Sequence, residues 1–127
     1  MNNLTKGDLK MEQVLIGNDR YTQVFSLDEK GNGNANHKYS VSSTDEPSTV
    51  FASVNFQDGA ILESGVNGCH NEDLIAIVIH RLQGFQAGAW AGRENAIAIT
   101  KLEEALQWLN YRTTSRQKRG VEGTHAI

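Results

Sequence analysis

The sequence is poor in the residues that cross-link a chain or hold it in a membrane. It has a single cysteine, Cys69, which cannot form an internal disulfide and so suits a reducing cytoplasm. No apolar stretch approaches the ~20 residues of a membrane-spanning helix. The first six residues contain no hydrophobic segment of the kind found in signal peptides. We therefore expect a cytoplasmic protein with neither a signal peptide nor a membrane partner.

Charge of the two signs is nearly balanced, which argues against a general nucleic-acid-binding protein. The net charge is −3 at pH 7, and a broad basic surface that could follow a phosphate backbone is missing. Basic residues do cluster locally, because Arg112, Arg116, Lys118 and Arg119 follow one another without an acidic residue among them. Planar guanidinium groups match the oxygen atoms of phosphates. We predict a small phosphorylated ligand and no nucleic acid polymer.

The first half of the chain predicts a small antiparallel β-sheet over residues 1–66. Polar turn residues separate short segments in which apolar or β-branched residues alternate with polar ones. The predicted strands are residues 11–16, 20–27, 37–43 and 49–57, and residues 28–36 are predicted to form an exposed loop. Asp58-Gly59 is typical of a two-residue hairpin turn, so we expect a further strand over residues 60–63.

The second half, residues 67–127, predicts two helices joined by a short link. The first helix starts near Asn71, whose side chain can cap it, and Gly84 and Gly88 mark its end. A link this short returns the chain antiparallel to the first helix. The predicted fold class is therefore α+β, with a small sheet followed by a helical hairpin.

The second helix is predicted to be much longer than the first. It begins near Arg93 and meets neither glycine nor proline before Gly120. Apolar residues recur along one face at three- and four-residue spacing, namely Ile99, Leu102, Leu106 and Leu109. With lengths of about 15 and 26 residues, the second helix extends roughly 15 Å beyond the first. We expect a second copy of the chain to cover this excess length, in a homodimer or a larger assembly.

Patterns typical of catalysis or metal binding are missing. The histidines are scattered, and Cys69-His70 is a pair of neighbours rather than a chelating spacing. Glu103 and Glu104 are adjacent on the predicted helix and point apart, which favours two solvated carboxylates. We predict no catalytic residue, no metal site and no cofactor, and hence a binding protein rather than an enzyme.

Four residues predict a binding site. Phe85 and Asn95 fall at the same end of the hairpin, where a ring face and an amide can recognise a purine. Arg112 and Arg116, one helical turn apart and expected to be exposed, offer planar forks for a diphosphate. Two alternatives stay open: Phe85 can be a core residue, and the arginines can be solvated cations that answer the helix dipole.

Distance decides how these four residues can cooperate. Asn95 and Arg112 are 17 positions apart in the sequence, which corresponds to about 25 Å along a helix. A mononucleotide-sized pocket does not span that length within one chain. Two chains packed antiparallel bring the Phe85 end of one against the Arg112 end of the other, which predicts a pocket at a subunit interface.

The helical half also resembles a known family. The residues that carry the resemblance are 72–82, 85–86, 93–96, 101–106, 108–109, 112–113, 116 and 119–124. This motif is similar to the helical hairpin shared by two families of phage anti-defence sponges, the type 1 Thoeris anti-defence proteins and the type 2 anti-CBASS proteins. The additional N-terminal strands and the lead-in Gly65-Val66-Asn67-Gly68 favour the Thoeris type.

The resemblance implies a non-enzymatic sponge that acts in the cytoplasm of an infected bacterial host cell. Such proteins bind the immune messenger glyco-cyclic ADP-ribose between protomers and withhold it from its effector. In the family an aromatic ring, an asparagine and two arginines contact this messenger. The corresponding residues here are Phe85, Asn95, Arg112 and Arg116.

The resemblance further implies a homodimer or a trimer of dimers, with separate sites for cyclic di- or trinucleotides. The candidate residues for such a second anion site are Arg119, Gly123 and Thr124. Two rival functions stay open. One is an enzyme that degrades the same messenger, and the other is a regulatory dimer whose basic helix end binds nucleic acid.

Overall fold

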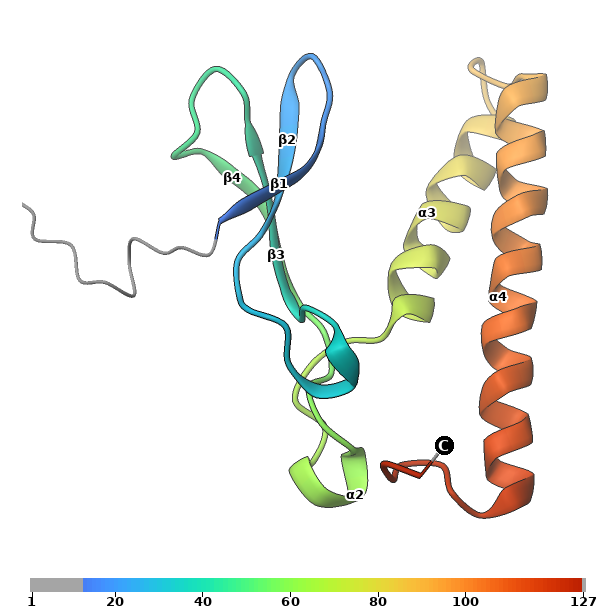
Figure 1. Ribbon diagram of the computed structural model, residues 1–127. Coiled ribbons are helices and arrows are strands. Elements are labelled where there is room, and N and C mark those ends of the chain that lie inside the picture. The colour runs from blue at the N-terminus through green and yellow to red at the C-terminus, as the bar shows by residue number, and fades with distance from the viewer. Residues whose placement is uncertain (1–12, 127) are drawn as a thin grey trace, which may run out of the picture. The chain divides into compact units, whose positions relative to one another are not determined.

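The structure is a computed structural model that describes residues 13–126 of the chain (Figure 1). The chain divides into two compact units, one ending at Cys69 and the other beginning at His70. The first contains a four-stranded antiparallel sheet and two short helices, the 3-10 helix η1 (Asn32–Asn34) and α2 (Ile61–Ser64), and the second contains a helical hairpin. The predicted α+β class, with the sheet before the helices, is confirmed.

The sheet is a simple meander in which each strand pairs with the next one along the chain. Its strands are β1 (Val14–Asn18), β2 (Thr22–Ser26), β3 (Lys38–Ser43) and β4 (Val50–Asn55). All three pairings are antiparallel, and Leu15 faces Phe25, whereas Val24 faces Val41. The first strand continues to Asn18, past the predicted end at residue 16, and its register shifts between Leu15 and Gly17. Residues 11 and 12 of that predicted strand lie outside the described residues.

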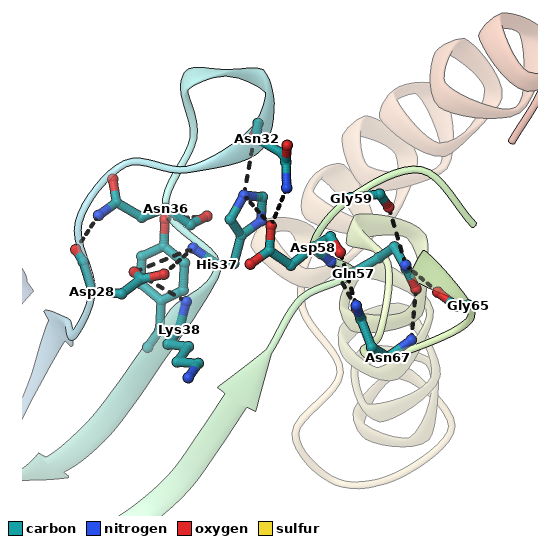
Figure 2. Close-up of polar contacts among 11 residues, drawn as sticks. Asp28, Asn32, Asn36, His37, Lys38, Gln57, Asp58, Gly59, Gly65 and Asn67 are labelled. Carbon is teal, nitrogen blue, oxygen red and sulfur yellow. Dashed lines mark hydrogen bonds and ion pairs between the residues drawn. The ribbon is translucent and has the colours of Figure 1, made fainter. Parts of the chain in front are cut away.

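The strand predicted over residues 60–63 is wrong, because the chain forms the one-turn helix α2 (Ile61–Ser64) there. Side-chain amides replace the strand partner that a hairpin would have supplied (Figure 2). Asn67 Oδ1 accepts the Asp58 N–H at 2.8 Å, and Asn67 Nδ2 donates to the Asp58 carbonyl at 2.8 Å. Gln57 in turn accepts the Asn67 N–H at 3.0 Å. These bonds satisfy the backbone of Asp58, and the backbone of Cys69 pairs with Asn55 and Gln57, so no returning strand is needed.

The helical unit consists of α3 (Asn71–Gln86) and α4 (Arg93–Arg119), with 16 and 27 residues. Their difference corresponds to about 16 Å of helix length, close to the predicted excess. His70 occupies the N-cap position that was predicted for Asn71, and Asp73 Oδ2 accepts the His70 N–H at 2.8 Å. Gly84 lies within α3 rather than ending it. Glycine is disfavoured in a helix but tolerated there.

The two helices pack through a narrow apolar seam. Ile79 of α3, with 8% of its surface exposed, is the one apolar residue of the described chain that is buried. The predicted stripe on α4, from Ile99 to Leu109, is half-buried. Ile77 and Val78 on α3 stay exposed although both are large and apolar. The hairpin therefore buries little of its apolar surface by itself.

Candidate ligand-binding site

The closed end of the hairpin is held by side chains from both helices. Gln86 Oε1, at the end of α3, accepts the N–H of Gly92 at 2.7 Å. Asn95 Nδ2, in the first turn of α4, donates to the carbonyl of Trp90 at 3.0 Å. Both bonds brace the link between the helices, so the backbone of Trp90 is fixed at the tip. We call residues 84–95 the hairpin tip.

The hairpin tip carries a small aromatic cavity of about 230 Å³. Its walls are the rings of Phe85 and Trp90, whose centroids are 5.5 Å apart at an interplanar angle of 49°. Gly84, Gly88 and Ala89 line the rest of it. The Arg81 guanidinium lies 4.9 Å from the Phe85 ring centroid, a cation–π distance. Phe85 is thus half-buried between a cation and a second ring.

The structure brings Phe85 and Asn95 together, because each contacts Trp90, one through its ring and the other through its amide. One N–H of the Asn95 side-chain amide donates to the Trp90 carbonyl in the link between the helices. Within residues 13–126, the side-chain carbonyl of Asn95 has no hydrogen-bond donor. It is therefore available to accept a hydrogen bond from a ligand.

The opposite end of α4 holds the two arginines, and they differ sharply. Arg112 is exposed, and no ion pair or hydrogen bond of its side chain is seen in the part of the chain that the structure describes. Arg116 is buried, with 8% of its surface exposed. The expectation that both guanidinium groups are exposed is therefore wrong for Arg116. The physical reason is that the C-terminal segment folds over it.

We call the segment Gly120–Ala126 the C-terminal tail. The Arg116 guanidinium binds this tail through four hydrogen bonds. Nε donates to Glu122 Oε1 at 3.0 Å and Nη1 donates to the Ala126 carbonyl at 2.7 Å. Nη2 donates to the carbonyls of Val121 and Thr124 at 2.9 and 3.1 Å. Since a guanidinium group has five N–H donors, most of its capacity is taken by the tail.

Two glycine turns in the backbone allow the C-terminal tail to reach Arg116. Gly120 follows α4 with φ 76°, the left-handed conformation that commonly ends a helix at glycine. The Val121 N–H then bonds back to the Arg116 carbonyl at 3.1 Å. Gly123 also has a positive φ, 83°, and turns the tail a second time. The chain is thereby folded back over the last turn of α4.

The residues predicted for a second anion site lie in and beside this tail. Arg119 is the last residue of α4 and is exposed. The Thr124 hydroxyl is used within the tail, since it donates to the Val121 carbonyl and accepts the Ala126 N–H. Gly123 contributes a turn rather than a side chain. A second site at Arg119, Gly123 and Thr124 stays a prediction.

The two ends of α4 do not meet within one hairpin. Asn95 and Arg112 lie on the same unbroken helix, so about 25 Å separates them along its axis. The cavity at the hairpin tip is smaller than the roughly 300–1,000 Å³ typical of a pocket for a whole small ligand. Arg112 is accordingly too distant to contact a nucleotide whose base occupies the cavity of the same hairpin.

The sheet unit holds a separate polar cluster, which the sequence did not predict (Figure 2). The buried His37 places Nε2 3.1 Å from the Asn32 carbonyl and 3.5 Å from Asp58 Oδ1. Asp28 accepts the backbone N–H groups of His37 and Lys38. These contacts fix the loop before β3. No group of three or more potential metal ligands is present among residues 13–126.

Comparison with known proteins decides the family. Residues 50–114, about half of the chain, match the family model described as the Acb2/Tad1 hairpin domain. The chain belongs to the Acb2/Tad1 hairpin domain family. It is also 65% identical over 75 residues to Thoeris anti-defense 1 of Bacillus phage SBSphiJ7. That alignment covers 59% of this chain and 53% of the relative, so the chain spans about half the length of this curated relative.

The Acb2/Tad1 hairpin match includes most, but not all, of the predicted site. It runs from β4 into α4 and contains Phe85, Asn95 and Arg112. Arg116 and the C-terminal tail lie beyond its last residue. Trp90 and Arg81, which the sequence analysis did not single out, lie within it. A tryptophan in a link of glycine and alanine was the signal that could have revealed the cavity, because such a ring has little apolar surface to pack against.

Proposed function

We propose that this protein is a phage anti-defence protein that binds glyco-cyclic ADP-ribose and sequesters it without cleaving it. The observation that carries the proposal is the aromatic cavity with the available Asn95 carbonyl at the hairpin tip. A ring face and an amide are the groups that recognise a purine base. The similarity to Thoeris anti-defense 1 supports an anti-defence role in the cytoplasm of an infected bacterial cell. No helix among residues 13–126 could cross a membrane.

The ligand site is proposed to form between two copies of the chain. Phe85 and Asn95 of one copy hold the base, and Arg112 of a second copy binds the diphosphate. Two observations support this arrangement. The distance along α4 separates these groups within a copy, and exposed Ile77 and Val78 leave α3 with apolar surface to cover. A homodimer or a trimer of dimers satisfies both requirements.

Arg116 has a different part in this proposal from Arg112. Its donors hold the C-terminal tail, so it shapes the end of α4 beside Arg112. Of these two arginines, Arg112 is the one whose exposed guanidinium could meet a diphosphate without first breaking contacts in the protein. Direct binding of the messenger by Arg116 would require the tail to leave.

Calorimetry with glyco-cyclic ADP-ribose tests the proposal. We expect the wild-type protein to bind one messenger per composite site, and the messenger recovered after denaturation to have its original mass. A messenger returned as a linear product would establish the rival enzyme. A titration that shows no binding, while duplex DNA binds, would establish the nucleic-acid-binding regulator instead.

A further inference from the structure

The exposed ring at the hairpin tip belongs to Trp90 rather than to Phe85. Phe85 is half-buried, with Arg81 on it at 4.9 Å and Trp90 beside it at 5.5 Å. Trp90 is 74% exposed, although an indole is costly to leave in water. The Asn95 amide fixes the backbone of Trp90. Thus Phe85 forms a half-buried wall of the cavity, and the ring of Trp90 is exposed to a ligand that enters it.

Gly84 gives an independent indication that something approaches this cavity. It lies in the last turn of α3, where glycine costs roughly 0.5–1 kcal/mol relative to alanine. Its φ is not positive, so the backbone does not require glycine. Beyond its own helix turn, a Cβ atom added there would meet no described heavy atom within 4 Å. Among residues 13–126, neither conformation nor packing explains the glycine, whereas a ligand lying over it would.

We infer that Trp90 is the ring on which the purine base of the messenger stacks, over the floor made by Gly84 and Gly88. This inference rests on the proposed function and names the residue that sets its preference for a base. The cavity of about 230 Å³ accepts one base and not a whole dinucleotide. The sugar and diphosphate groups lie outside it, toward the Arg112 side chain of a second copy.

Fluorescence can report this contact directly, because the sequence contains two tryptophans, Trp90 and Trp108. In a Trp108→Phe protein, Trp90 is the single indole, and the affinity of that protein for glyco-cyclic ADP-ribose serves as the reference. We expect the messenger to quench its emission, with a midpoint equal to the calorimetric one. We expect Trp90→Ala to weaken binding by about tenfold or more and Trp90→Phe to retain most of it, since stacking needs a ring.

Two substitutions of Gly84 form a matched pair. Gly84→Ala adds a methyl group that the unliganded protein accommodates but that reaches toward the bound base, so affinity should fall severalfold. Gly84→Leu fills the floor of the cavity and should abolish binding, while circular dichroism shows an unchanged helix content. As a control, ribose 5-phosphate, which lacks a base, should not quench the Trp90 fluorescence of the Trp108→Phe protein.

The outcomes separate the inference from the function on which it rests. Absence of messenger binding by the wild-type protein would refute the proposed function itself. Normal wild-type binding, with Trp90 unquenched and Trp90→Ala equally tight, would overturn the inference alone. So would a change of oligomeric state in Trp90→Ala by native mass spectrometry, because Trp90 would then be a subunit contact.

Discussion

The two ends of the helical hairpin both use polar side chains to hold an irregular segment of backbone, but they expose different groups. At the hairpin tip, Gln86 and Asn95 bind the backbone of the link and leave the ring of Trp90 exposed. At the end of α4, Arg116 binds the backbone of the C-terminal tail and becomes buried itself. In both places polar side chains fix an irregular segment. The difference lies in the charge: the tip exposes the ring of Trp90, whereas the other end exposes the guanidinium group of Arg112 beside the rings of Trp108 and Tyr111.

Arg112 and Arg116 sharpen this comparison, since they are one helical turn apart on the same helix. Equal spacing and equal chemistry predict equal roles, yet one side chain is exposed and the other is buried. The tail makes the difference, because three of its carbonyls and the Glu122 carboxylate accept hydrogen bonds from Arg116 and none is seen with Arg112 in the described residues. A charged residue in a sequence motif can therefore be structural while its neighbour stays exposed.

Removal of the Arg116 guanidinium should have the largest effect on stability. Arg116→Ala leaves Glu122 without its partner and the tail carbonyls without donors, so we expect a loss of about 2–3 kcal/mol. Hydrogen exchange should show lost protection at residues 121–126. Arg116→Lys keeps the charge but not the planar set of N–H donors, so it should recover only part of the lost stability. An Arg116→Ala protein with a protected tail and unchanged thermal unfolding would contradict the structural role.

Removal of the Arg112 guanidinium should affect binding instead. Arg112→Ala removes an exposed side chain without a partner among the described residues, so stability should change by less than about 0.5 kcal/mol. Affinity for glyco-cyclic ADP-ribose should fall about 10- to 100-fold, as expected for lost hydrogen bonds to a charged group. Arg112→Lys keeps the charge and should show an intermediate affinity. Undiminished calorimetric binding by Arg112→Ala would remove this residue from the site.

Glycine substitutions at the two ends should differ in sign or size. Gly120→Ala forces a Cβ into the left-handed conformation at φ 76° and should destabilise the protein by about 1–2 kcal/mol. Gly92→Ala changes a residue with φ −169°, where the new Cβ meets only the flexible Glu94 side chain at 3.4 Å. Its effect should stay within about 0.5 kcal/mol. Denaturant unfolding measures both, and equal losses would show that the backbone at the tip is as constrained as the tail.

The two amides of the hairpin tip should have equal effects on stability but different effects on binding. Asn95→Ala and Gln86→Ala each remove one hydrogen bond and should each cost about 1 kcal/mol. Their effects on binding should differ, because only Asn95 offers a carbonyl to the messenger. Calorimetry should show weaker binding for Asn95→Ala than for Gln86→Ala. Equal affinities would mean that Asn95 acts only by bracing the link.

The sequence predicted the parts of this fold that depend on periodic patterns. Alternation in residues 20–57 and the apolar spacing from Ile99 to Leu109 gave the order of strands and helices. The errors fall where a single side chain decides the local structure. Asp58-Gly59 is a usual hairpin signal, but the Asn67 amide pairs with the Asp58 backbone from nine positions away. Such a contact has no signature in local propensity.

In the candidate site, too, the sequence predicted what depends on helical periodicity and missed what depends on single contacts. Helical spacing correctly placed Phe85 and Asn95 at one end, because both lie close to the link between the helices. It did not distinguish Arg112 from Arg116, since a helix pattern carries no information about a tail that folds back by two glycine turns. Trp90 was missed because a link residue belongs to no periodic face.

The central claim is that two copies of the chain share one messenger site. The most direct test mixes two proteins with weakened binding, Arg112→Ala and the double variant Phe85→Ala/Asn95→Ala, after unfolding and refolding them together. Native mass spectrometry with glyco-cyclic ADP-ribose should then show mixed dimers that carry one intact messenger at wild-type affinity, since one of their two sites is complete. Mixed dimers that bind no messenger would contradict a shared site, and so would a monomer that carries one.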